Sequence, residues 1–517
     1  MIEKIFTNNI KKIFKNDINY NSNNKFPLKI AVAVSGGVDS MVLLKLLNNF
    51  TTKNKLNTEI YAITINHNLR PESYEESKLI SKEIKNSISN DIKHIIIEIN
   101  WNKYKDINEI KNIEEIARDK RYFEFQKKCY ELNINYLFLG HHLNDQIETF
   151  LLRLKKNSLL FGLNCMKFIS NFPLIPKYPN NFKKKIQIIR PLLNIEKISI
   201  IDYCQLSKIK WFEDYTNKDI NLTFRNFIRN YYELKKDSNE LAKDKIIDSI
   251  YQINEFNDNI NNEIKLIKIE LNNTKKIILI LNDLNLIIKL PKFGFINKYS
   301  INSINRFLFK EFYKISPTNN YYLKYSRIDN FDSSIVINDT ESNNKKSMAR
   351  IIFDEEYLNG DNNVPINKGR RVKRLSILEC DLTIDYDTDE NDIILNIKRS
   401  NPKTNKLNET DIELNNGNNN QWFLFDNRFW FKINFENNKE LENSELKIRL
   451  FNKNDFNKLE LNGFVDYVDK DNFKISNLLN IPMLLLNNRI IGFPTIDLIS
   501  YKYRDLIDIE WTVKSDF

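Results

Sequence analysis

The sequence is poor in glycine and histidine, with 10 Gly and 4 His among 517 residues. An average soluble protein uses glycine for about 7% of its residues. This scarcity, together with only 12 Pro, excludes collagen-like repeats and Gly/Pro-rich disordered chains. Asn, Lys and Ile are abundant throughout, which we attribute to drift in codon composition. We therefore expect the few positions that keep Gly or His to have a specific reason.

Cysteines and long apolar runs are scarce as well. The four cysteines, Cys129, Cys165, Cys204 and Cys380, lie far apart and form no C-x-x-C pair. This spacing argues against a zinc ribbon, an iron–sulfur cluster or a disulfide framework and is typical of a reducing compartment. The apolar runs are far shorter than the ~20 residues of a membrane span, and residues 1–15 lack the apolar core of a signal peptide. We predict a cytoplasmic protein without membrane contact.

The charge balance is basic, with 78 Lys and Arg against 68 Asp and Glu, a net charge of +10. Such a balance is compatible with a polyanionic partner such as a nucleic acid. A lysine-rich composition with solvated faces explains the charge equally well. Hydrophobic residues make up 42% of the chain, enough for sizeable cores, and the length predicts about three domains at ~150 residues each.

The first half of the chain alternates strand and helix patterns. Strands are expected at 28–34, 59–65, 93–99 and 136–139, and helices at 38–49, 72–85, 108–132 and 145–154. This alternation predicts an α/β fold with a doubly wound parallel sheet, a Rossmann-like architecture. Ligands of such sheets bind beyond the carboxyl ends of the strands.

The pattern changes after about residue 232. Residues 240–270 are expected to be helical, and β-rich stretches follow. We predict a catalytic domain at 1–232, a helical and mixed linker or middle domain at 233–345, and a C-terminal region at 346–517. That last region is expected to contain a small α+β, mainly β-rich domain at about 446–512.

A glycine loop follows the first strand and opens the first helix of the sheet. It consists of Ser35, Gly36, Gly37, Val38, Asp39 and Ser40. Glycines allow a tight turn and a close approach of the backbone to an anion, while helix N-terminal amides and serine hydroxyls donate to phosphate oxygens. Asp39 would repel a phosphate directly, so it is assigned a role through Mg²⁺. The loop is not a Walker A motif, and an ordinary turn with a serine cap is the simpler alternative.

The sequence SGGVDS resembles the PP-loop of the N-type ATP pyrophosphatase superfamily, whose members cleave ATP between its α- and β-phosphates. Four further segments resemble those of tRNA(Ile)-lysidine synthetases. They are Ile65-Asn66-His67-Asn68-Leu69-Arg70 with Ser73; Asn112 to Arg118 with Arg121 and Tyr122; Gly140 to Thr149 with Leu151-Leu152-Arg153; and Arg190-Pro191-Leu192-Leu193, then Trp211 to Asn217 and Arg225-Asn226-Phe227-Ile228-Arg229. Their order and spacing match across roughly residues 35–229, and the chain is identified as a member of this family.

The resemblance implies a ligase that uses ATP and Mg²⁺. ATP adenylates the C2 oxygen of the wobble cytidine in a CAU-anticodon tRNA(Ile), releasing pyrophosphate. L-lysine then attacks C2 and expels AMP, which forms lysidine and changes the codon read from AUG to AUA. The middle and C-terminal regions are expected to bind the tRNA. The oligomeric state is left open, with a homodimer as one candidate.

The resemblance also assigns roles to residues. The catalytic residues are Asp39, Arg118, His141 and Asp145; Ser35 to Ser40 and His67 bind the nucleotide; Asp39 holds Mg²⁺. Residues assigned to substrate binding are Arg70, Glu115, Arg121, His142, Glu148, Arg190, Asp214, Arg225 and Arg229. Simpler alternatives remain open: surface histidines at a turn for the His pair, solvated helix charges for Arg118 and Arg121, and a structural ion network for Glu213, Asp214, Arg225 and Arg229.

Three asparagines depart from the family pattern. Asn66 and Asn144 stand where the family has Asp, and Asn68 stands where it has Gly. Asn keeps a hydrogen-bond acceptor but loses the charge, so Asn144 shifts the metal or acid–base role to Asp145. Asn68 still reaches positive φ more readily than most residues. The alternatives are another PP-loop tRNA-modifying enzyme of the thiolase type, disfavoured by the unpaired cysteines, and an inactive tRNA-binding relative.

Overall fold

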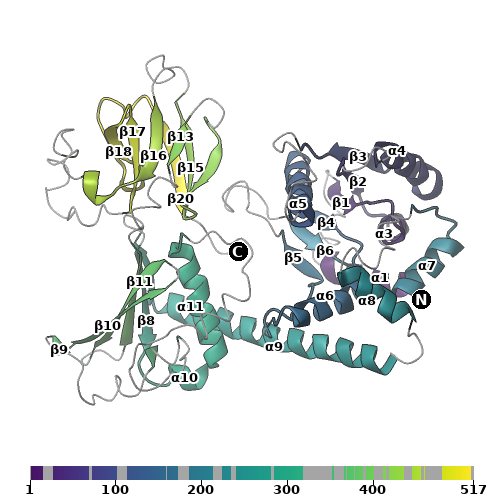
Figure 1. The fold of residues 1–517 in the computed structure, drawn as a ribbon, viewed down its shortest axis with the longest axis horizontal. Coiled ribbons are helices and arrows are strands. Elements are labelled where there is room, and N and C mark those ends of the chain that lie inside the picture. The colour runs from purple at the N-terminus through teal and green to yellow at the C-terminus, as the bar shows by residue number, and fades with distance from the viewer. Residues whose placement is uncertain are drawn as a thin grey trace. The chain divides into compact units, whose positions relative to one another are not determined.

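The structure is a computed structural model (Figure 1). It describes residues 2–14, 27–68, 73–101, 113–158, 160–172, 186–212, 224–234, 240–280, 285–317, 348, 352–353, 366–367, 370–377, 379–387, 392–400, 411–414, 419–435, 445–455, 459 and 480–513. The chain divides into two compact units, one formed by Met1–Ile175 with Lys184–Asn257 and one by Pro176–Lys183 with Asp258–Phe517. No described helix is long and apolar enough to cross a membrane.

The first unit is built on one mostly parallel sheet. Its strands are β1 (Leu28–Ala33), β2 (Thr58–Asn66), β3 (Lys93–Glu98), β4 (Tyr136–Phe138), β5 (Ile169–Asn171) and β6 (Gln187–Ile189). They lie in the order β3-β2-β1-β4-β6-β5, and every neighbouring pair is parallel except β5 and β6. The predicted α/β fold with a doubly wound sheet is confirmed.

Helices cover both faces of this sheet (Figure 1). They are α1 (Ile2–Phe14), α3 (Val38–Lys53), α4 (Ser73–Glu83) with the π-helical turn η1 (Ile84–Ile88), α5 (Ile113–Glu131), α6 (Leu143–Lys155), α7 (Lys197–Leu206) and α8 (Phe224–Leu234). Alternate residues of β1 enter two different cores: Ile30 and Val32 join side chains of α3, and Ala31 joins side chains of α5. A strand buried on both faces is apolar where it crosses the core, which explains the apolar run from Ile30 to Ala33 in β1.

The strand order places a topological switch between β1 and β4. From β1 the chain proceeds outward through β2 to β3, and it then returns to add β4 and β6 on the other side of β1. Loops leaving adjacent strands in opposite directions open a crevice at their carboxyl ends, where ligands of such sheets bind. The glycine loop leaves β1 and the His141–His142 pair follows β4, so both border this crevice.

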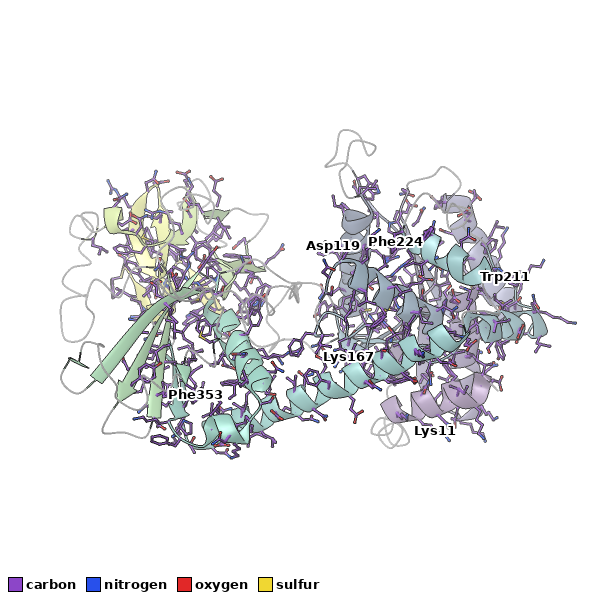
Figure 2. All side chains as sticks on the ribbon, turned by 60° about the horizontal axis from the view of Figure 1, so that its bottom comes forward. Lys11, Asp119, Lys167, Trp211, Phe224 and Phe353 are labelled. Atoms are coloured by element: carbon purple, nitrogen blue, oxygen red, sulfur yellow. The ribbon has the colours of Figure 1, made fainter. Side chains whose placement is uncertain are left out.

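Helix α1 closes the core on the α3 side of the sheet. It buries Ile2, Phe6 and Ile10 against α3 and α7 while its other face stays exposed. Trp211 and Phe212, which follow α7, pack against the same core (Figure 2). The N-terminal segment is therefore an integral part of the first unit.

The described residues of the second unit form three sheets. One has the order β7-β8-β12-β11-β10-β9, from β7 (Ile277–Ile280), β8 (Asn285–Pro291), β9 (Ile366–Asn367), β10 (Arg370–Ile377), β11 (Cys380–Asp387) and β12 (Asp392–Arg399). The second has the order β13-β16-β17-β18-β19, from β13 (Ile412–Leu414), β16 (Leu446–Leu450), β17 (Pro482–Leu486), β18 (Arg489–Phe493) and β19 (Leu498–Ile499). The third joins β14 (Trp422–Phe425), β15 (Phe429–Asn434) and β20 (Asp508–Val513).

The remaining elements of the chain are α9 (Glu240–Asn273), α10 (Phe295–Lys298), α11 (Ile301–Ile315) and the short 3₁₀ turns η4 (Lys453–Asp455) and η6 (Pro494–Ile496). Helix α11 lies against β12. Strands β8 and β12, which pair with each other, lie on opposite sides of residue 345 in the sequence. The division into three domains at 232 and 345 stays a prediction.

One buried carboxylate links the three sheets of the second unit. Asp426, in the turn between β14 and β15, accepts two hydrogen bonds from Arg399 of β12, at 2.9 and 2.8 Å, and another from Arg428. Arg428 also donates to the carbonyl of Asn480, just before β17, at 2.8 Å. Buried ion pairs of this kind specify geometry more than they add stability. They fix how these sheets pack together.

We predict that Phe6→Ala lowers the opening free energy of the first unit by about 3–5 kcal/mol, because it leaves a cavity beneath α1. Hydrogen–deuterium exchange of the α3 amides measures the opening of this unit alone. Asn8→Ala, an exposed change on the same helix, should alter it by no more than about 0.5 kcal/mol. Equal exchange in both variants would show that α1 contributes nothing to this core.

Candidate active site

The glycine loop forms a tight turn around the start of α3. The Ser40 hydroxyl donates to the Gly37 carbonyl at 2.9 Å and accepts the Ser35 amide at 3.2 Å. Gly37 is the N-cap residue and has no side chain to occupy the first amides of α3. The unpaired amides of a helix N-terminus carry partial positive charge. The loop is therefore built to receive an anion such as a phosphate.

Gly36 is required by its conformation and its surroundings. Its φ is +83°, and a Cβ there would stand 2.6 Å from Ile80 Cδ1. Its carbonyl accepts the backbone amide of Phe212 at 3.0 Å, which fixes the loop to the segment after α7. A residue other than glycine would have to strain its backbone and displace a core side chain.

Gly140 brings the end of β4 against the start of α3. A Cβ on Gly140 would lie 3.1 Å from the Asp39 carbonyl carbon and 3.2 Å from the Ser40 nitrogen. These are backbone atoms of the glycine loop's helix, so they cannot rotate away as a side chain would. The absence of a side chain at Gly140 therefore lets the His pair approach Asp39.

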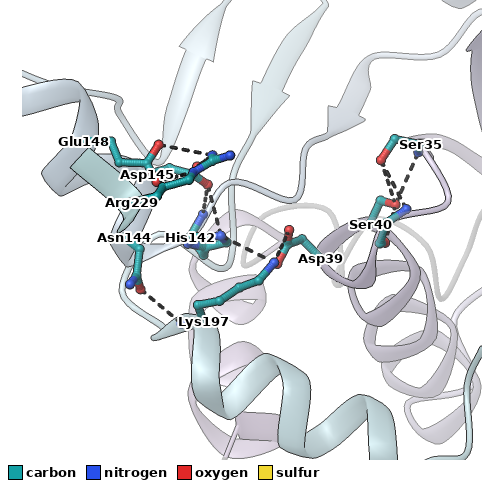
Figure 3. A network of polar contacts seen from close by, with 10 residues as sticks. Ser35, Asp39, Ser40, His142, Asn144, Asp145, Glu148, Lys197 and Arg229 are labelled. Atoms are coloured by element: carbon teal, nitrogen blue, oxygen red, sulfur yellow. Dashed lines mark hydrogen bonds and ion pairs between the residues drawn. The ribbon is translucent and has the colours of Figure 1, made fainter. Parts of the chain in front are cut away.

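Two carboxylates flank His142 (Figure 3). His142 is the N-cap residue of α6 and is buried. Its Nε2 lies 3.5 Å from Asp145 Oδ2 and 3.6 Å from Asp39 Oδ1, and its backbone amide donates to Asp145 Oδ2 at 3.0 Å. The geometry joins residues from the β1 loop and the β4 loop. Its Nδ1 is buried without a hydrogen-bond partner among the described residues.

Arginines of α8 neutralise the acidic face of α6. Arg229 donates from Nε and Nη2 to the two oxygens of Glu148, at 2.6 and 3.1 Å, and its Nη2 lies 3.6 Å from Asp145 Oδ1. Arg225 Nε lies 3.3 Å from Glu148 Oε2. Burial raises the pKa of Glu148, although Arg229 opposes this. Burial alone would also raise the pKa of Asp145, but the neighbouring histidines and Arg229 hold it below its usual value.

His141 faces the other way, toward Arg190. Arg190 donates from Nε to His141 Nδ1 at 3.3 Å and from Nη1 to the Ser170 hydroxyl and the Lys167 carbonyl, at 2.8 and 2.9 Å. An imidazole nitrogen that accepts a hydrogen bond is unprotonated. Burial and the nearby Arg190 accordingly lower the pKa of His141 to about 3. His141 is neutral at physiological pH.

The β2 end contributes His67 to the same edge of the sheet. Its Nδ1 is buried without a hydrogen-bond partner among the described residues, and burial with the nearby Arg121 lowers the pKa of His67 to about 4. Arg118 and Arg121 of α5 both lie over the ring of Tyr122, at 5.6 and 5.8 Å from its centroid. The asparagine that replaces the family's glycine, Asn68, has φ +51°, as predicted.

Some predicted site residues lie outside the described part of the chain. Arg70 and Asp214 fall in segments 69–72 and 213–223, and the side chain of Glu115 is not described. The structure brings Asp39, His142, Asp145, Glu148, Arg225 and Arg229 into one network and His141 with Arg190 into a second. The catalytic and binding roles of these residues stay predictions.

Sequence reasoning missed one member of the site, Lys197. This first residue of α7 places its Nζ 2.7 Å from both Asp39 oxygens, and its backbone amide donates to Asn144 Oδ1 at 3.1 Å (Figure 3). Lys197 lies in a lysine-rich chain, four residues after the R-P-L-L segment, and nothing in the local pattern distinguishes it. Only the fold brings it to Asp39.

Residues 2–233 match the family model described as PP-loop domain. This stretch of the chain is therefore a PP-loop domain. Two relatives of this PP-loop domain are tRNA(Ile)-lysidine synthases: that of Wolbachia pipientis wMel is 38% identical over 237 residues, and that of Rickettsia felis is 39% identical over 244. Each match covers 46% of this chain and 50% or 51% of the relative. The predicted resemblance to tRNA(Ile)-lysidine synthetases is confirmed over this domain, which spans about half the length of those relatives.

The PP-loop domain also matches a solved structure with a different activity. A U34-tRNA thiolase from Methanococcus maripaludis matches with 16% identity and a TM-score of 0.34, covering 47% of this chain and 79% of its own. A likeness at this level does not distinguish one PP-loop activity from another.

We predict that Gly36→Ala weakens ATP binding at least about tenfold, because the new Cβ strains the backbone and displaces Ile80. Isothermal titration calorimetry measures the affinity. The matched control is Gly294→Ala, which shares a φ of +80° but has nothing within 4 Å of the added carbon. ATP affinity unchanged in Gly36→Ala would show that the loop tolerates a side chain and that its glycine is not required.

The four histidines of the chain give a second prediction. Burial lowers the pKa of His67 and His94 to about 4, that of His141 to about 3, and that of His142 below its usual value. His94 also bonds to Thr64 and Ser81. The folded state favours neutral imidazoles, so their contribution to stability is complete above pH 6.5 and is lost as the pH falls toward 4.

We expect the imidazole resonances of His67, His94 and His141 in the folded protein to stay in place between pH 8 and about 5 in an NMR titration. Stability of the first unit should fall by up to about 1.4 kcal/mol per pH unit for each of these three histidines as the pH drops from 6.5 toward 4. A histidine that titrates near pH 6.5 in the folded protein would contradict its burial.

Proposed function

We propose that the protein ligates lysine to C2 of the wobble cytidine of a CAU-anticodon tRNA(Ile). The observation that carries the proposal is the meeting of the glycine loop, Asp39 and the His142–Asp145 pair at the switch point of a domain closely similar to tRNA(Ile)-lysidine synthases. A phosphate-binding loop beside buried, oriented carboxylates suits a reaction in which a nucleotide is transferred and an amine then attacks.

The reaction has two steps. The cytidine C2 oxygen attacks the α-phosphorus of ATP, the bond to the β-phosphate breaks, and pyrophosphate leaves. The ε-amine of lysine then attacks C2, the C2–O bond breaks, AMP leaves, and the amine loses a proton. Changing the wobble base in this way would convert the codon read from AUG to AUA.

The residues of the glycine loop bind and orient the nucleotide. The amides at the start of α3 and the hydroxyls of Ser35 and Ser40 donate to phosphate oxygens. Neutral His141 and the cations Arg118, Arg121 and Arg190 would face the nucleotide and the target base. A guanidinium suits both anionic and planar groups. Arg229 pairs with Asp145 and Glu148 and fixes both carboxylates beside the crevice.

The donor set fits Mg²⁺ bound through the nucleotide. Asp39 supplies a carboxylate at the mouth of the loop, and among the described residues no group of three His, Cys, Asp or Glu side chains could hold a metal alone. Mg²⁺ typically uses one or two carboxylates together with substrate phosphates and water. When bound, Mg²⁺ would neutralise charge on the phosphates.

The cysteines argue against the thiolase alternative. Cys129, Cys165, Cys204 and Cys380 are all buried, and none forms a disulfide within the described part of the chain. Burial raises the pKa of Cys129 to about 12 and those of Cys165 and Cys204 to about 11, so these three thiols resist forming the thiolates that sulfur chemistry needs. The inactive alternative rests on the three asparagines, but Asn144 and Asn68 both make ordered contacts at the site.

We further propose that the protein is a cytoplasmic enzyme and that its second unit binds the body of the tRNA. The net charge of +10 supports an RNA partner. Purified protein with ATP, Mg²⁺ and labelled lysine should label a CAU-anticodon tRNA(Ile) transcript. A transcript with U at the wobble position should stay unlabelled. No lysine in the CAU transcript would reject the proposal.

We predict that Asp39→Ala and Asp145→Ala each reduce lysine incorporation at least about a hundredfold, because each removes a charge that orients the reacting groups. The rate of label transfer to tRNA measures this, and circular dichroism checks the fold. The control, Asp91→Ala, removes an exposed carboxylate of the same unit and should leave the rate unchanged. Normal rates in either site variant would remove that residue from the mechanism.

A further inference from the structure

Three helix N-termini converge at the crevice. Asp39 is the second residue of α3, His142 caps α6, and Lys197 is the first residue of α7. The contacts among them are 2.7 Å between Lys197 Nζ and Asp39 and 3.6 Å between His142 Nε2 and Asp39 (Figure 3). Because each helix N-terminus is electropositive, the three together form a site for a polyanion larger than one phosphate.

Lys197 is held in this position by Asn144. The N-cap residue of α7, Glu196, makes no capping bond with its side chain. Asn144 Oδ1 instead accepts the amide of Lys197, and the amide of Leu143 donates to the carbonyl of Ile195 at 2.9 Å. The start of α6 thereby fixes the start of α7. This contact requires an acceptor oxygen on the side chain at position 144 but no charge. An asparagine can therefore stand where the family has an aspartate.

The Lys197–Asp39 pair is the exchangeable ion pair of the cluster. The side chains of Lys197 and Asp39 are 33% and 28% exposed, whereas the Glu148 side chain clamped by Arg229 is 6% exposed. A partly exposed pair contributes little stability and opens at little cost. Asp39 would also repel an incoming polyphosphate unless a cation offset its charge. An ammonium has three donors, so it can turn from a carboxylate to phosphate oxygens.

We propose that Lys197 binds the polyphosphate of the nucleotide, that Asn144 positions Lys197, and that Lys197 exchanges with a cation on Asp39. Its ammonium lies 2.7 Å from both Asp39 oxygens. When the nucleotide enters with its cation, Lys197 turns to the phosphates and leaves Asp39 to the cation. This inference rests on the proposed function for the identity of the nucleotide.

Calorimetry with ATP and Mg²⁺, in the absence of tRNA and lysine, tests the contact. Lys197→Met should bind ATP about tenfold to a hundredfold more weakly than the wild type, as expected for the loss of a charged hydrogen bond. The matched control is Lys243→Met, which removes a lysine paired with Glu196 at 2.7 Å and should keep the wild-type affinity. Wild-type affinity in Lys197→Met would overturn the proposal.

Mg²⁺ without nucleotide tests the resting pair. Because Lys197→Met leaves Asp39 without its ammonium, Mg²⁺ alone should raise the unfolding temperature of this variant more than that of the wild type. Equal shifts would show that Lys197 does not occupy the cation's place on Asp39 and would overturn that part of the proposal.

Two variants of Asn144 test the positioning. Asn144→Asp retains the acceptor and should keep ATP affinity, whereas Asn144→Leu should lose affinity with an unfolding temperature close to that of the wild type. Equal affinity in the two would overturn the role of Asn144. These measurements need neither tRNA nor lysine. If the binding results are as expected but lysine is not incorporated into the tRNA, the lysidine reaction is rejected. The role of Lys197 in nucleotide binding is then retained.

Discussion

The site depends on the close approach of two backbone segments. The end of β4 passes so near the first turn of α3 that a single Cβ on Gly140 would meet the backbone of Asp39 and Ser40. Backbone atoms cannot rotate aside as a side chain would, so any side chain at this position would push the two segments apart by a few tenths of an ångström. The approach in turn places His142, Asp145 and Asp39 within reach of one another. It is also the point where the strand order of the sheet reverses, which is where such folds bind ligands.

The carboxylates of the site are balanced by ion pairs, and these carboxylates differ in how far they are exposed to solvent. Arg229 clamps Glu148, whose side chain is nearly buried, with two hydrogen bonds that favour fixed geometry. Lys197 holds Asp39 in a pair open to solvent, which favours exchange with a ligand. The histidines add no charge, since burial lowers the pKa of each of them. The crevice thus presents fixed carboxylates on one side and a movable ammonium on the other.

The asparagines of the motifs keep hydrogen bonds where charge is lost. Asn68 adopts the positive φ that a glycine would provide, and its side chain donates to Glu98 at 3.2 Å. Asn144 caps α7 through its oxygen. Asn66 accepts the Asn68 amide at 3.0 Å. The drift that enriched the chain in asparagine was therefore tolerated at positions where an acceptor oxygen or a left-handed conformation is sufficient.

The sequence by itself determined the fold of the first unit and the place of the glycine loop between β1 and α3, because strand and helix periods, Gly36 and Gly37 are local signals. It also indicated that His141, His142 and Asp145 belong near that loop, since each follows a strand end. The tertiary structure alone decided that Lys197 pairs with Asp39, 158 residues away, and that His141 turns to Arg190 while His142 turns to the carboxylates. Pairing across such distances depends on strand order and helix packing, which leave no periodic trace in the residues that meet.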